Sequence, residues 1–121
     1  MIDADRLHGQ LRSHVGDRAG PRAAVELLIA HGSWLGRPDF VDRFTYTGVD
    51  FDTEVTSTGI EWTMAIKALD HGFACSAANE SLLRIAASMA YGIPIDLRRE
   101  AARLDHASAT LVVEAFTHTA A

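Results

Sequence analysis

Apolar residues recur at helical spacing along most of the chain, and capping residues divide this pattern into separate helices. The first expected helix covers residues 3–15, because an Asp at position 3 or 5 can cap its start. The second is expected to run from Pro21 to Gly32, since proline suits the first helical position and glycine the left-handed stop. The apolar stripes of these two helices are Leu7, Leu11 and Val15, and Val25, Leu28 and Ile29.

The remaining helices are expected from Ile60 to Gly72, from a cap at Ser76 to Tyr91, from Asp96 to Leu104, and after Asp105, and residues 38–44 can add a further short helix. The helix that ends at Tyr91 has the broadest apolar stripe, so we expect it at the centre of the core. The last helix is expected to bury Leu111, Val112, Ala115 and Phe116.

The stretch between Thr45 and Gly59 has a different pattern. Threonines recur, and aromatic or branched residues alternate with polar ones, which is typical of extended structure. The sequence therefore predicts a mainly α single domain over residues 1–121. We expect a five- or six-helix orthogonal bundle with a minor β-hairpin or an ordered loop at about 45–58.

The second half of the chain also carries a resemblance. It reads WTMAIKAL at 62–69, LRIAASMA at 83–90 and GIPIDL at 92–97, followed by Leu104 and Asp105. Over about residues 22–119 it resembles small uncharacterised helical proteins of GC-rich actinobacteria, a group with no assigned activity. The resemblance implies a helical fold and transfers no role to any residue.

Composition bounds the class of protein. The chain has 121 residues, one cysteine (Cys75) and a net charge of −5, so a disulfide framework is excluded and a broad nucleic-acid-binding face is disfavoured. It has ten arginines and one lysine, which is typical of a GC-rich bacterial genome. No apolar run is long enough to span a membrane, and the start lacks a secretory pattern, so we expect a cytoplasmic protein without membrane contact.

Residues 38–62 combine the net negative charge with many of the aromatic residues. Residues 38–61 contain six acidic residues and one basic residue, Arg43, so this segment alone accounts for the net charge of −5. Five of the nine aromatic residues lie in 38–62. Acidic residues steer a basic partner and aromatic residues supply contact area. A solvated acidic loop whose aromatic residues enter the core is the competing interpretation.

The leading functional prediction is a non-enzymatic protein–protein interaction module, acting as an adaptor, inhibitor or regulator. Its partner is expected to carry a basic patch, and a homodimer is a further option because symmetric dimers are the commonest oligomers. The predicted partner-binding residues are Tyr46, Asp50, Phe51, Asp52 and Glu54. The acidic side chains would steer the encounter, and Phe51 or Tyr46 would anchor it.

No cofactor or metal site is predicted. The six histidines form no pair four residues apart on a helix. Asp50, Asp52, Glu54 and Glu61 fall at positions 1, 3, 5 and 12 of a calcium loop, but Val55 stands where that loop needs glycine. His31 and His71 each precede a glycine, where an imidazole suits a helix C-terminus.

Two alternative functions stay open. Residues 24–44 have the outline of a helix-turn-helix DNA-binding regulator, although the acidic residues of 38–54 would repel phosphates. A small enzyme would use Cys75, which precedes a helix start, with His71 or other histidines. A small buried cysteine is the simpler interpretation of Cys75.

Overall fold

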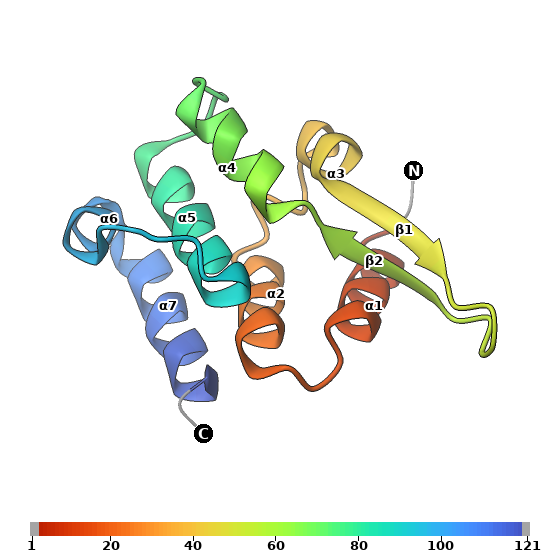
Figure 1. The fold of residues 1–121 in the computed structure, drawn as a ribbon. Helices are drawn as coiled ribbons and strands as arrows, with labels where there is room; N and C mark the ends of the chain where they lie inside the picture. Colours follow the sequence, from red (N-terminus) through yellow and green to blue (C-terminus); the bar gives the residue numbers. More distant parts are fainter. Residues whose placement is uncertain (1–2, 120–121) are drawn as a thin grey trace.

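Helices dominate the structure, and one short β-hairpin interrupts them. The computed structural model describes residues 3–119. In chain order the described elements are α1 (Ala4–Val15), α2 (Ala19–His31), α3 (Pro38–Phe44), β1 (Thr45–Val49), β2 (Thr56–Ile60), α4 (Trp62–Asp70), α5 (Ala77–Tyr91), α6 (Leu97–Arg103) and α7 (His106–Thr119) (Figure 1). The mainly α class with a minor hairpin is thereby confirmed.

Local capping sets most of the helix ends. The side chains of Asp3, Ser76 and Asp96 accept hydrogen bonds from backbone N–H groups in the first turns of α1, α5 and α6. Gly32 and Gly92 end α2 and α5 in the left-handed conformation, with φ of 83° and 71°. These ends are the ones that the sequence pattern predicts.

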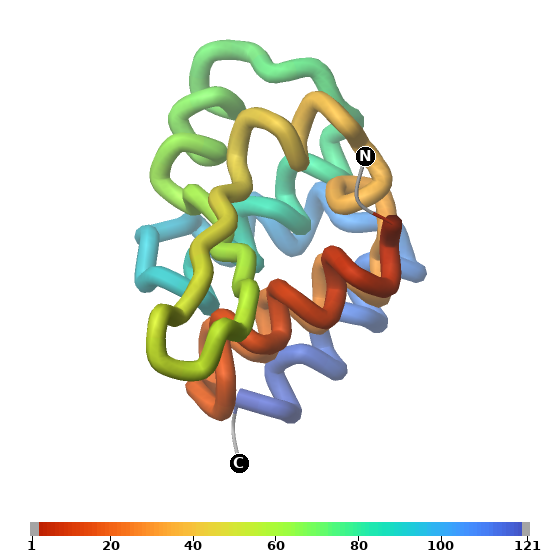
Figure 2. Tube along the Cα trace, turned by 90° about the vertical axis from the view of Figure 1, so that its right-hand side faces the viewer, coloured from red at the N-terminus to blue at the C-terminus, as the bar shows by residue number. Residues whose placement is uncertain are grey.

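The core forms around α2 and α5, which pack against each other, while α7 lies next to α5 and also packs on α2 (Figure 1). Leu28, Leu82 and Leu83 are buried at this centre, as are Trp34 and Phe40 from the α2–α3 region. The stripes of α1 and α5 face this core as expected. On the far side of α2, α1 runs alongside the hairpin and packs on β2 (Figure 2).

Four details of the helix prediction are wrong. Ile60, the expected start of the fourth helix, ends β2 instead, and α4 begins at Trp62. The described part of the chain contains seven helices where five or six were expected, because both short segments, α3 and α6, are helical. α2 begins at Ala19, two residues before Pro21, since the first helical turn tolerates proline at more than its first position. Phe116 is 40% exposed, because α7 packs against α2 and α5 along a narrow face that includes Val112 and Ala115 but not Phe116.

Within residues 3–119, no helix combines the length and the apolar character needed to cross a membrane.

Candidate functional site

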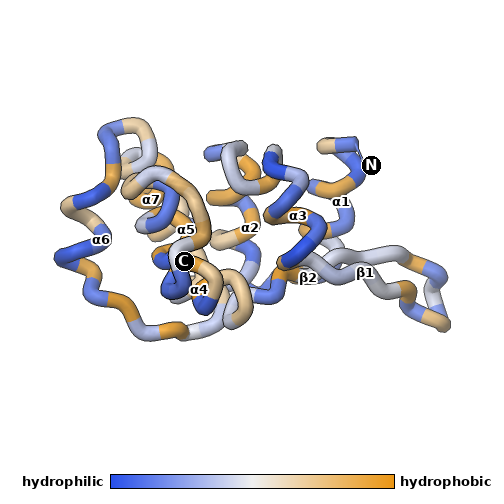
Figure 3. Tube along the Cα trace, turned by 90° about the horizontal axis from the view of Figure 1, so that it is seen from above, coloured by the Kyte–Doolittle hydropathy of each residue, from blue (hydrophilic) through white to orange (hydrophobic). Residues whose placement is uncertain are grey.

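The hairpin formed by β1 and β2 projects beyond the helices (Figures 1 and 3). Its strands are antiparallel, with Thr47 opposite Thr58. The base is anchored to α1: the buried Thr58 hydroxyl donates to Gln10 Oε1 at 2.8 Å, and the Tyr46 hydroxyl lies 3.3 Å from His14 Nε2. These contacts hold the hairpin base on the helical body and leave the connecting turn in solvent.

A compact turn at 50–55 closes the hairpin. The Asp50 carboxylate accepts hydrogen bonds from the N–H groups of Asp52 (2.8 Å) and Thr53 (3.1 Å), and Glu54 N–H donates to the Asp50 carbonyl at 2.8 Å. These bonds to the charged carboxylate lower the pKa of Asp50 below its usual value. Glu54 takes φ of 58°, the left-handed conformation that such a turn requires. Asp50 therefore organises the turn as well as contributing charge.

The turn presents an apolar group to solvent. Phe51 is 98% exposed, and Val49 and Val55 on either side of the turn are 55% and 46% exposed. We call Val49, Phe51 and Val55, with Asp52 and Glu54, the hairpin tip. The sequence analysis did not predict the two valines as binding residues. Their positions on either side of the acidic turn could have indicated that they belong to the same surface.

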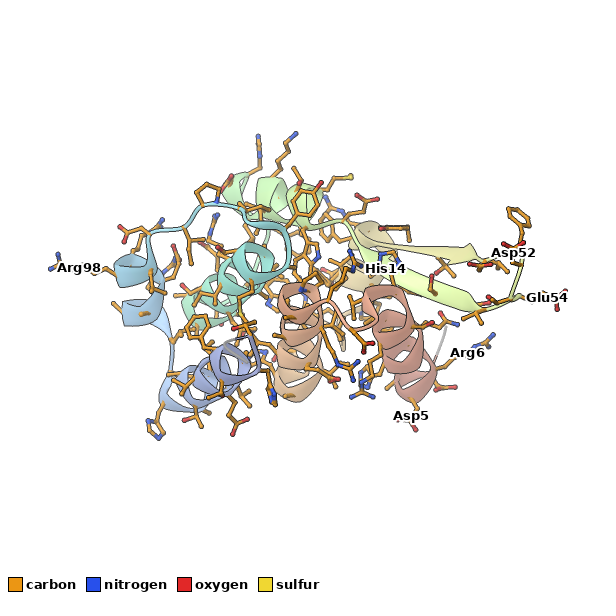
Figure 4. The ribbon with its side chains drawn as sticks, turned by 60° about the horizontal axis from the view of Figure 1, so that its bottom comes forward. Asp5, Arg6, His14, Asp52, Glu54 and Arg98 are labelled. Carbon is orange, nitrogen blue, oxygen red and sulfur yellow. The ribbon has the colours of Figure 1, made fainter. Side chains whose placement is uncertain are left out.

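The charges of the hairpin tip are all negative. The side chains of Asp52 and Glu54 extend from the far end of the hairpin, away from the helices (Figure 4). Neither makes an ion pair with another described residue. An exposed phenyl ring with unpaired carboxylates beside it can dock into an apolar pocket that has a basic rim.

The structure brings four of the five predicted site residues together. Asp50, Phe51, Asp52 and Glu54 share the turn, whereas Tyr46 lies at the hairpin base, where its ring covers Gly59 and meets His14 edge-on. Among the other aromatic residues of the segment, Phe40 and Phe44 are buried and Trp62 is half-buried. Most aromatic residues of 38–62 thus serve the core, as the competing interpretation held.

Both arginines of the segment with the helix-turn-helix outline, residues 24–44, make contacts within the chain. Arg37 forms an ion pair with Asp39 at 2.7 Å and lies over the rings of Trp34 and Phe73 at 5.0 and 4.7 Å. The guanidinium also lowers the pKa of Asp39. The Arg43 guanidinium lies over the rings of Phe44 and Phe73, at 4.9 and 5.2 Å from their centroids. Arg37 is thus held by contacts within the chain, and the exposed Arg43 shares α3 with Asp39 and Asp42, so the electrostatics of this region do not favour DNA binding.

The surroundings of Cys75 raise the pKa of its thiol, mainly through burial and then through the nearby Glu80 carboxylate. A catalytic thiolate needs the opposite shift. The imidazole of His71 bonds through Nδ1 to the Lys67 carbonyl at 2.7 Å, which occupies it at the end of α4. These contacts do not favour the Cys75 enzyme.

Apart from the hairpin, the surface has a groove of about 780 Å³, lined mainly by α2 and α7. Its charged rim is largely paired, with Arg12 bonded to Glu26 and Arg22 near Asp17. Across residues 3–119, no three His, Cys, Asp or Glu side chains gather closely enough to hold a metal ion.

No protein-family model, curated protein or solved structure matches this chain.

Proposed function

We propose that this chain is a non-enzymatic protein–protein interaction module, an adaptor, inhibitor or regulator that binds through its hairpin tip. The observation that carries the proposal is the 98% exposure of Phe51 on a turn held by the Asp50 carboxylate. A folded chain gains nothing by holding a phenyl ring in water, whereas burial of such a ring contributes about 1.5–3 kcal/mol. The ordered turn also reduces the entropy lost on docking.

The chemistry of the tip defines the partner. Phe51 suits an apolar pocket, and Asp52 and Glu54 suit lysine or arginine side chains around its edge. The two kinds of residue would act at different stages. Carboxylates accelerate the encounter in a salt-dependent way, while the buried ring slows dissociation.

The test compares tagged baits in a lysate, read by mass spectrometry, followed by binding kinetics with the purified partner. The tip variants are Phe51→Ser and the double variant Asp52→Lys/Glu54→Lys. Matched controls are Val113→Ser, which changes another exposed apolar residue, and Asp5→Lys/Glu114→Lys, which makes the same charge change on α1 and α7. Circular dichroism checks that all baits are folded.

We expect a protein that the wild type and both controls capture and both tip variants lose. Phe51→Ser should weaken its binding about 10- to 100-fold, mainly through faster dissociation. The charge-reversed variant should associate more slowly and with less dependence on salt. If every captured protein binds the tip variants as well as the wild type, the proposal is wrong.

A further inference from the structure

The outer edge of the hairpin has no partner. Two backbone hydrogen bonds show which residues of β1 are bonded to β2. Asp50 N–H donates to the Val55 carbonyl, and Glu61 N–H donates to the Phe44 carbonyl. Residues 44, 46, 48 and 50 therefore direct their backbone groups toward β2, and Thr45, Thr47 and Val49 direct theirs away from it. α1 packs on β2, whereas the backbone of β1 lies beside β2 and α3, and β1 reaches α1 through the Tyr46 side chain, which contacts His14.

The β1 edge also lacks the features that prevent strand pairing. Proteins protect exposed edges with charged residues, prolines, bulges or covering elements. β1 reads TYTGV, without charge or proline, and pairs with β2 in unbroken register. From Tyr46 to Val49 every residue of β1 is exposed. The edge is thus open to another strand.

We propose that a second copy of this chain occupies the edge, with the two β1 strands antiparallel about a two-fold axis at Thr47. The outward-directed residues are placed symmetrically about Thr47, so the pairs are Thr47 with Thr47 and Thr45 with Val49 of the other copy. Each of these is a hydrogen-bonded pair, which uses every outward N–H and C=O of the strand. The result is a four-stranded sheet with β2 of each copy outside.

Charge complementarity supports a second copy as the occupant. Antiparallel pairing about Thr47 places the acidic turn of one copy beside the end of α3 in the other. Arg43, which lies over Phe44 and Phe73, is exposed there beside the exposed Asp42, and it has no carboxylate within 4.0 Å among residues 3–119. Asp52 and Glu54 have no ion pair within their own chain either. The two acidic turns lie at opposite ends of the sheet, which separates like charges.

Cysteine cross-linking tests the register, in a Cys75→Ser background. Paired Cα atoms lie about 5.5 Å apart, within disulfide range, whereas residues four positions away lie about 13 Å along the strand. Thr47→Cys should therefore form a covalent dimer under mild oxidation. Thr45→Cys and Val49→Cys should each stay uncross-linked alone and form a disulfide when mixed. Equal cross-linking of all three variants alone, or of none, contradicts the register.

Sedimentation measures the assembly without any cysteine change. The wild type should sediment as a dimer of 13.1 kDa chains at high micromolar concentration. Val49→Pro removes an outward N–H that β2 does not use, so the hairpin should remain while the dimer is lost. Phe51→Ser leaves the edge intact and should remain dimeric, which separates this inference from the proposed function. A wild type that stays monomeric overturns the proposal. That result would also be seen if the edge binds a strand of another protein, and the proposal would then be equally wrong.

Discussion

The close approach of α2 and α5 makes the effect of one methyl group predictable. Gly20 lies in the first turn of α2, and a Cβ atom built there would come within 3.0 Å of the Met89 carbonyl oxygen in α5. Because the obstructing atom belongs to the backbone, no side-chain rotation relieves the clash. Gly20→Ala must therefore push the two central helices of the core apart.

The size of the effect follows from packing. A separation of about 0.5–1 Å forfeits a quarter to a half of the dispersion attraction between the atoms concerned. Overpacking of this kind costs about 1–3 kcal/mol. The higher helix propensity of alanine offsets this cost by up to about 1 kcal/mol of unfolding free energy, and by less in the first turn of a helix. The expected net loss of unfolding free energy is about 1–2 kcal/mol, equivalent to a Tm lower by about 4–10 °C.

Gly9→Ala is the matched control. Gly9 lies in the middle of α1, is exposed, and has nothing within 4 Å of a built Cβ. The same substitution should therefore stabilise the protein by about 0.5–1 kcal/mol. Urea unfolding followed by circular dichroism measures both variants beside the wild type. If Gly20→Ala is as stable as the wild type while Gly9→Ala behaves as expected, the argument from the α2–α5 contact is wrong.

Two further predictions concern buried polar groups. Burial lowers the pKa of His31, and its Nδ1 has no hydrogen-bond partner among the described residues, so the folded protein resists protonation there. The free energy of unfolding should then fall as the pH drops through about 6.5, and this fall should be smaller in His31→Gln. Urea unfolding at several pH values measures the fall, and equal pH dependence in the two proteins would contradict the prediction. Glu100, which is 2% exposed, accepts from the buried Ser81 hydroxyl at 3.0 Å. Glu100→Ala should destabilise the protein by about 2–3 kcal/mol and Glu100→Gln by less, and equal urea midpoints for the two variants would count against this role.

The sequence was sufficient for features that depend on residues near one another in the chain. The stripe of Leu7, Leu11 and Val15 and the cap at Ser76 act within a few residues, so the helices that they define appear as predicted. The change of pattern after Thr45 likewise predicted the hairpin region. Helix ends and periodicity follow from local backbone hydrogen bonding and need no information about distant contacts.

Tertiary structure alone decided which side chains of the 38–62 segment are available to a partner. Phe40 and Phe51 are both aromatic residues beside acidic ones, yet one is fully buried and the other 98% exposed. The sequence alone does not show that the Arg37 guanidinium lies over Trp34 and Phe73, because these two rings are far apart in the chain. The open edge of β1 also depends on α1 covering β2 instead. Burial is a property of long-range packing, so a local pattern shows that a segment is amphipathic without showing which of its members face solvent.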